Sequence, residues 1–126
     1  MRAMKIDRVA AEGRNVFTAY DDGWVEVSGK RHAANVAVSG ERVVAGWTSA
    51  GLEALTREQV AALAALRPEI VLIGSGRAFR FPSPALLAPL YEARIGVEVM
   101  DTRAACRTYN ILLAEGRGVL AALIVD

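Results

Sequence analysis

Side chains that can bind an anion gather in two segments in the second half of this sequence. Gly74–Gly76, with the arginine that follows it, is one segment, and Asp101–Arg107 is the other. Glycine-rich turns expose backbone N–H groups, a helix amino terminus adds a positive dipole end, and guanidinium groups bind carboxylates and phosphates. The pattern predicts a pocket for a small anionic ligand between the two segments. The candidate ligand-binding residues are Gly74, Ser75, Gly76, Arg77, Arg80, Asp101, Thr102, Arg107 and Asn110, and Arg103 is a further cation beside them.

The same residues also fit a purely structural interpretation. In that case the glycines turn the chain, Asp101 caps a helix and pairs with a nearby arginine, and the other arginines are solvated. The segment is not a dinucleotide fingerprint, because Arg77–Pro82 follows the glycines where a third glycine should open a helix. A P-loop lysine is also missing, since Lys5 and Lys30 are the only lysines. Both interpretations stay open at the level of the sequence.

The sequence holds no complete catalytic set. Cys106 is the only cysteine and His32 the only histidine, which excludes an intrachain disulfide and a cysteine-based zinc site. A thiol near a helix amino terminus and Arg107 can be nucleophilic, but a position beside an apolar stripe favours a small buried core residue. His32 is expected in an exposed loop. We expect no metal and no cofactor, and the balance is against an enzyme.

The loop of residues 77–82 offers a different chemistry, because two phenylalanines alternate with arginine. Phe79, Arg80 and Phe81 are therefore candidate partner-binding residues, since exposed aromatic rings and arginine are typical anchors of protein interfaces. The alternative is that both rings fold back over the core. The sequence favours neither alternative.

Alternating strands and helices must position these residues in the second half of the chain. Thr56 to Gln59 matches a capping box and predicts a helix to about Leu66, which the residue before Pro68 ends. A second helix is expected after Ser83 as its cap, with Pro89 kinking or restarting it, and a third runs from the Asp101–Thr102 cap to Gly116. The expected strands are 70–73 and 95–100, both interpreted as buried, and 119–125.

The first half of the chain is predicted to be mostly antiparallel β-structure. Residues 16–20 and 24–27 flank the turn sequence Asp21-Asp22-Gly23, and residues 34–38 and 42–46 flank another turn. Residues 1–14 are expected to be a weakly ordered arm or a first short strand. The predicted fold class is α/β: a mixed central sheet with parallel βαβ units in the second half, helices on its faces, and an N-terminal antiparallel β-hairpin layer. We expect a single domain over residues 1–126.

Composition limits the classes of partner. The formal net charge is +1 with both signs scattered, so the sequence lacks the basic footprint of a nucleic-acid-binding protein. No apolar run approaches the roughly 18 residues of a transmembrane helix, and the first residues lack the apolar core of a signal peptide. We expect a cytoplasmic protein without membrane insertion. A protein partner and a small anionic ligand both remain candidates, and the sequence does not indicate a homo-oligomeric state.

The run MDTRAACRTYNILLAEGR, preceded by PEIVLIGSG and RFPSP, resembles a known family. The family includes the mitochondrial complex I assembly factor 3 and the adipogenesis-associated Mth-domain protein, and the resemblance covers roughly Asn15 to the end of the chain. It implies an α/β fold with an added β-layer, and the assembly-factor branch implies a non-catalytic binding module with a protein partner. The resemblance implies no catalytic residue.

The family motif is matched at a defined set of positions. They are Gly74, Gly76, Phe81, Pro82, Asp101, Thr102, Cys106, Arg107, Thr108, Tyr109 and Asn110. This chain departs from the pattern at two places. Tyr20-Asp21-Asp22-Gly23 stands where a Tyr-Gly pair is more usual, and Arg103 stands where a small residue is often found.

Overall fold

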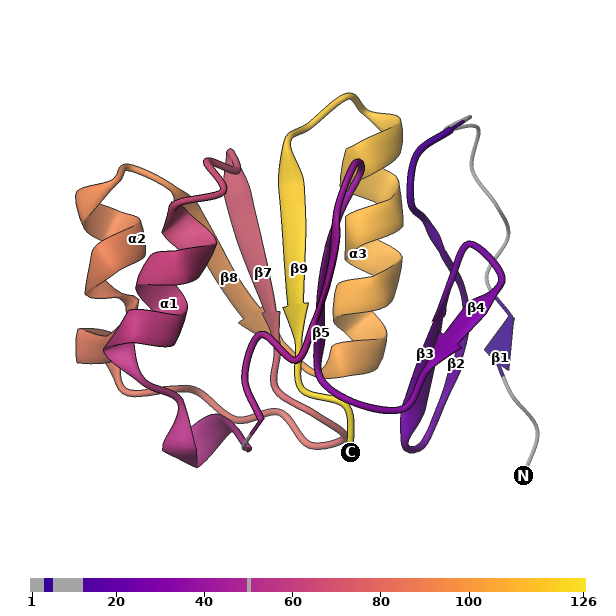
Figure 1. Cartoon of the computed structure of the whole chain (residues 1–126), viewed down its shortest axis with the longest axis horizontal. Coiled ribbons are helices and arrows are strands. Elements are labelled where there is room, and N and C mark those ends of the chain that lie inside the picture. Colours follow the sequence, from indigo (N-terminus) through magenta and orange to yellow (C-terminus); the bar gives the residue numbers. More distant parts are fainter. Residues whose placement is uncertain (1–3, 6–12, 50) are drawn as a thin grey trace.

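The computed structural model describes residues 4–5, 13–49 and 51–126. Two β-sheets lie on either side of one long helix, α3 (Thr102–Ala114), as Figure 1 shows. The smaller sheet is antiparallel and follows chain order: β1 (Met4–Lys5), β2 (Phe17–Asp21), β3 (Trp24–Val27) and β4 (Lys30–His32). The larger sheet has the strand order β6-β5-β9-β7-β8.

The larger sheet is mixed, with its parallel part in the second half of the chain. Strand β7 (Ile70–Gly74) is parallel to both of its neighbours, β8 (Gly96–Met100) and β9 (Val119–Leu123). On the other side of β9, β5 (Val36–Ser39) is antiparallel to β9 and to β6 (Val43–Ala45). The predicted fold class is confirmed, including the β-hairpin layer.

Two apolar cores cover the two faces of the larger sheet, because successive side chains of a strand point to opposite faces. Leu72 packs in the core that also contains Tyr109 of α3 and Phe17 of β2. Its neighbours Val71 and Ile73 pack in the second core, under α1 (Arg57–Ala64) and α2 (Ala88–Glu92). Two short 3-10 helices, η1 (Leu52–Ala54) and η2 (Pro84–Leu87), complete that side. Helix α3 is thus enclosed between the larger sheet and the hairpin sheet.

The predicted starts of two helices are confirmed. Thr56 and Gln59 form the capping box of α1, with the Thr56 hydroxyl accepting from Gln59 N at 3.2 Å. Asp101 caps α3 by accepting from Ala104 N at 2.9 Å. Gly116 has a φ of 81° after the end of α3, a conformation that glycine adopts without strain. Both helices therefore begin where their side-chain oxygens predict.

The cap expected at Ser83 is wrong. Ser83 makes no side-chain cap hydrogen bond, and a 3-10 helix begins at Pro84. The α-helix starts only at Ala88, so Pro89 lies in its first turn, where a missing N–H costs nothing. A restart of the helix near Pro89 is what the structure shows.

Strand β8 was predicted to be buried and is not. It hydrogen-bonds only to β7 at the end of the sheet, and none of Gly96–Met100 is buried. In the predicted segment only Ile95, just before the strand, is buried. Val97 and Val99 pack against the core on one face of the sheet and Met100 against the core on the other, while Glu98 is exposed. A short apolar run does not reveal an edge position.

The N-terminal region also differs from its prediction. Lys30–His32 forms β4 against β3 rather than a loop, and His32, opposite Val25, is half-buried. Burial, and then the charge of Lys30, hold the pKa of His32 below its usual value. Met4–Lys5 forms β1, paired with β2, while residues 1–3 and 6–12 of the predicted arm lie outside the described residues. Among the residues that the structure describes, no helix has the length and apolarity to cross a bilayer.

Candidate functional site

The two segments singled out in the sequence meet at the carboxyl edge of β7 and β8. These strands are parallel neighbours, so Gly74–Gly76 and Asp101–Thr102 leave the sheet side by side. Thr102 N donates to Gly76 O at 3.0 Å, and Gly76 N donates to Thr102 Oγ1 at 2.9 Å. The same hydroxyl donates to Ile124 O at 2.6 Å. Thr102 therefore joins the ends of β7 and β9 to the first turn of α3.

The glycines bring protein groups close together at this edge. A Cβ on Gly74 would lie 2.7 Å from Leu123 Cδ2 and 3.1 Å from Thr102 Cα. Gly76 has a φ of 103°, and a Cβ there would lie 2.8 Å from the Asp126 carboxylate oxygens. The space that the glycines leave is thus filled by the chain itself.

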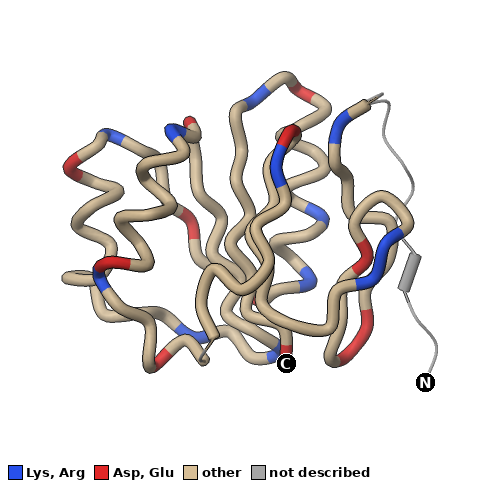
Figure 2. The backbone as a smooth tube through the Cα atoms, viewed as in Figure 1, with Lys and Arg blue, Asp and Glu red and all other residues tan. Residues whose placement is uncertain are grey.

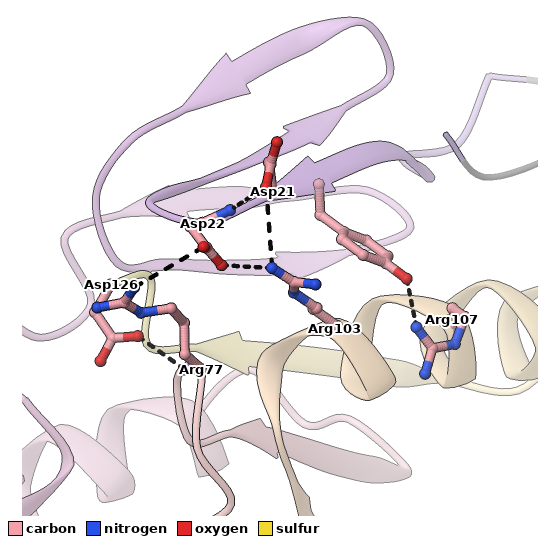
Figure 3. A network of polar contacts seen from close by, with 7 residues as sticks. Asp21, Asp22, Arg77, Arg103, Arg107 and Asp126 are labelled. Carbon is pink, nitrogen blue, oxygen red and sulfur yellow. Dashed lines mark hydrogen bonds and ion pairs between the residues drawn. The ribbon is translucent and has the colours of Figure 1, made fainter. Parts of the chain in front are cut away.

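Four arginines were candidates for this edge: Arg77, Arg80, Arg103 and Arg107. Two of them, Arg77 and Arg103, lie close to carboxylates of the hairpin turn (Figure 3). Arg103 forms a short hydrogen bond to Asp22 Oδ1 and lies 3.9 Å from Asp21. Arg77 Nη1 lies 3.9 Å from Asp22 Oδ2, and its backbone N donates to Asp126 Oδ1 at 2.8 Å. The carboxylate of Asp22 lies where the sequence predicted an anionic ligand.

The other two arginines lie apart from this network. Arg80 pairs with Glu53 at 2.8 Å, on the side of η1. Arg107 is exposed and donates to the hydroxyl of Tyr20, near whose ring the Arg103 guanidinium also lies, at 5.7 Å from the centroid. The structure therefore brings Gly76, Arg77, Thr102 and Arg103 together, but not Arg80 and Arg107. A ligand-binding role for any of these residues stays a prediction.

A small hollow lies beside the network, lined by Tyr20, Trp24, Gly76, Arg77, Thr102, Arg103 and Asp126, among others. Its volume of about 20 Å³ has room for one water molecule. Organic ligands occupy sites of hundreds of Å³. In this conformation the hollow is too small for a metabolite.

Asn110, a candidate ligand-binding residue, and its neighbour Tyr109 bind the N-terminal part of the chain. Asn110, which is 2% exposed, accepts from Phe17 N at 2.9 Å and donates to Phe17 O at 2.8 Å. The Tyr109 hydroxyl donates to Asn15 O at 2.8 Å. Both side chains bind the hairpin sheet because that sheet covers the side of α3 facing away from the larger sheet. The amide of Asn110 is therefore engaged by the backbone of Phe17, and a ligand-binding role for it stays a prediction.

Cys106 is buried in the core, with 0% of its surface exposed. Burial raises the pKa of its thiol far above the usual range, and the opposing charge of Arg107 is the smaller effect.

We predict that a disulfide reagent modifies Cys106 about a hundredfold or more slowly in the folded protein than in urea at pH 8, because the thiolate forms only when the structure around it opens. Equal rates would contradict the buried placement. Absorbance of the released thiol measures both.

The loop of residues 77–82, which we call the aromatic loop, projects from the same carboxyl edge. Phe79 and Phe81 are 62% and 60% exposed, and their ring centroids lie 6.5 Å apart in an edge-to-face arrangement. The loop is held from below: Ser75 Oγ donates to Ala78 O at 2.7 Å and accepts from Arg80 N at 3.1 Å. Of the two alternatives, the exposed placement is the one that the structure shows.

Sequence reasoning missed the acidic partners of the network. The turn chemistry of Asp21-Asp22-Gly23 does not reveal a salt bridge, and no local pattern points to Asp126. The resemblance marks departures at both Asp21-Asp22 and Arg103, without showing that the two segments meet. Those two departures are an ion pair in the structure, with Arg103 bonded to Asp22 across 81 positions of sequence.

Comparison with known proteins identifies relatives of the chain. Residues 17–124 match the family model described as "Protein of unknown function (DUF498/DUF598)". The bovine protein named NADH dehydrogenase [ubiquinone] 1 alpha subcomplex assembly factor 3 is 34% identical over 108 residues, 84% of this chain. The match spans only 58% of that protein's own length.

Solved structures share the fold. The crystal structure of a Bordetella parapertussis protein is 42% identical, with a TM-score of 0.85 over 92% of this chain and 99% of that one. The solution structure of a Bordetella pertussis protein described as a Mth938-like domain is 36% identical, with a TM-score of 0.79 over 98% of this chain and 93% of that one. The arrangement of two sheets around α3 is thus shared with these proteins.

Proposed function

This chain belongs to the DUF498/DUF598 family of proteins of unknown function, and on that premise we propose that it is a non-catalytic binding module for a protein partner. The partner is a component of a respiratory NADH dehydrogenase under assembly. Support for this class of partner comes from the relatives named as assembly factors. The part of the molecule that supports a binding role is the aromatic loop of residues 77–82.

One observation carries the proposal: two large apolar rings project into solvent from an ordered loop. Arg80 lies between Phe79 and Phe81 and is fixed by Glu53. A hollow of about 300 Å³ adjoins the loop and can receive a partner side chain; it is lined by Leu52, Glu53, Arg80, Phe81, Pro82, Ser83 and Leu86. Aromatic and arginine side chains beside a pocket are frequent anchors of protein interfaces. An ordered loop also loses less conformational entropy on binding.

The alternative, a small-molecule or anion-binding protein or an enzyme with its pocket between Gly74–Gly76 and Asp101–Arg107, has less support. The Asp22 carboxylate already pairs with the side chains of Arg77 and Arg103, and the Asp126 carboxylate accepts from the backbone N of Arg77. The hollow beside them holds about one water molecule. A ligand would have to displace the hairpin turn to enter.

Replacing Phe79 and Phe81 together by serine should reduce capture of NADH dehydrogenase subunits by the tagged chain about thirtyfold, the loss expected for about 2 kcal/mol of anchor energy. The tagged chain is purified from the cells in which it naturally occurs, and quantitative mass spectrometry measures the amount of each NADH dehydrogenase subunit purified with it. Tyr91 and Ile111, 54% and 57% exposed, provide a matched control as a double serine variant. Equal capture by both variants would refute the loop as the binding surface.

A further inference from the structure

A second polar surface lies at the opposite end of the larger sheet, where β7 and β9 begin. A groove of about 210 Å³ opens there. We call it the arginine groove: its rim carries Arg14, Arg42 and Arg67, and its apolar lining is Leu66, Pro68, Val119 and Leu120. Figure 2 shows basic segments on the loops at this end of the molecule, the upper end in that view, with acidic segments next to them. Neither the relatives' names nor the partner proposal assigns a role to it.

The three guanidinium groups of the groove differ from those of the opposite edge in their partners. Within the described part of the chain, no carboxylate lies within 4.0 Å of Arg14, Arg42 or Arg67. Glu41 is the single acidic residue of the lining, so three positive charges face one negative charge. The neighbouring Glu69 is already bound by Arg117 at 2.6 Å and by Gly118 N at 3.3 Å. Among the described residues, the groove therefore has an excess of positive charge, and none of its three guanidinium groups is in an ion pair.

Arg14 is held over the groove by the turn between β5 and β6. Asn15 N donates to Gly40 O at 2.9 Å, and Asn15 Nδ2 donates to Ser39 O at 3.0 Å. The Arg14 guanidinium lies against Gly40 so closely that a Cβ there would be 2.6 Å from Nη2. Glycine at this position therefore leaves the space that the guanidinium occupies.

The other two arginines also stand on fixed backbone. Arg42 N donates to Ser39 Oγ at 3.1 Å, and Ser39 N donates to Arg42 O at 2.9 Å, which closes the same turn. Arg67 has a φ of 55° and donates its N–H to Ala64 O at 3.0 Å at the end of α1. Three arginines from three segments are thus directed to one groove by backbone that is already ordered.

We propose that the arginine groove binds a small oxyanion, a phosphate or carboxylate group of a metabolite. Guanidinium groups donate paired hydrogen bonds to such groups, and their charge makes those bonds stronger than neutral ones. The half-buried Leu66 and Pro68 add an apolar side against which the uncharged part of the ligand packs. This site is separate from the aromatic loop, so its failure leaves the partner proposal untouched.

The test is a titration of the full chain with pyrophosphate and with citrate, followed by ¹⁵N–¹H NMR at constant ionic strength. The wild type should show saturable shifts of the backbone N–H signals of Gly40, Arg42, Arg67 and Gly118. Arg67→Ala should weaken binding about tenfold or more, as expected for the loss of a hydrogen bond from a charged group. Dispersion of the same spectra reports whether each variant is folded.

The chain offers a matched control for the loss of charge. Arg94 is also exposed, also follows a helix, and has a φ of 59°, close to that of Arg67, but it lies outside the groove. Arg94→Ala should leave the affinity unchanged, and Arg14→Ala should weaken it as Arg67→Ala does. The proposal is overturned if Arg94→Ala weakens binding as much as Arg67→Ala does. It is also overturned if neither anion gives saturable shifts up to about 10 mM, a concentration above the dissociation constants of even weak specific complexes.

Discussion

Asn110→Ala is expected to destabilise the protein by about 3 kcal/mol, because it leaves two buried backbone groups without a partner. Asn110 accepts from Phe17 N and donates to Phe17 O, so its amide substitutes for a neighbouring strand at that point of β2. An unsatisfied buried polar group costs about 1–3 kcal/mol, and alanine removes both partners at once. Urea unfolding monitored by circular dichroism measures the difference.

Tyr109→Phe is the matched control for this prediction. It removes one hydrogen bond from the same helix to the same sheet region, the bond to Asn15 O, while keeping the ring. The ring keeps its edge-to-face contact with Phe17, whose centroid lies 5.0 Å away. We expect a loss of about 1 kcal/mol for Tyr109→Phe. If Asn110→Ala costs no more than this, the double hydrogen bond is not what fixes β2 on α3.

The second large effect is expected at Gly74, the last residue of β7. A Cβ there would lie 2.7 Å from the Leu123 side chain and 3.1 Å from the α-carbon of Thr102. Leu123 is fully buried, and Thr102 makes three hydrogen bonds to the backbone of Gly76 and Ile124, so neither can move freely. Gly74→Ala should therefore destabilise the protein by about 2–3 kcal/mol, in the upper part of the usual range of about 1–3 kcal/mol for overpacking. The midpoint of urea unfolding gives the value.

Gly96, the first residue of β8, is the control for Gly74. It is exposed, and an added Cβ would meet its closest atom, Ile70 Cγ1, at 3.5 Å, an ordinary contact. Alanine there should change the stability by no more than about 1 kcal/mol, in the stabilising direction, because it restricts the unfolded chain. Equal losses at both positions would show that the close contacts at Gly74 are not the cause of its loss, and would contradict the prediction.

Features set by neighbouring residues were predictable from the sequence. The capping box at Thr56 and Gln59 and the Asp101 cap of α3 depend on side chains a few positions apart, and both are confirmed. The alternation of strand and helix that implies parallel pairing was also visible, and β7 pairs in parallel on both sides. Local hydrogen bonds and the period of the hydrophobic residues were sufficient to predict this part of the fold.

Features set by contacts distant in sequence were not predictable. The pairing of Arg103 with Asp22 and of Asn110 with Phe17 depends on how the hairpin sheet docks on α3, and no local pattern encodes that docking. The edge position of β8 depends on strand order, which a short apolar run does not report. The candidate pocket failed to appear as an open cavity for the same reason: the Asp22 carboxylate at its edge comes from the first half of the chain.

The position of β9 has a consequence for biosynthesis. This strand lies between β5 and β7 in the larger sheet, yet it is the last of the strands to be translated. While the ribosome is still making residues 119–123, the β5–β6 pair and the β7–β8 pair can exist only as separate pieces with open apolar edges. Open edges of this kind favour mispairing with other chains. The larger sheet of the nascent protein therefore closes in a single late step. Until that step, its open strand edges are accessible to a chaperone.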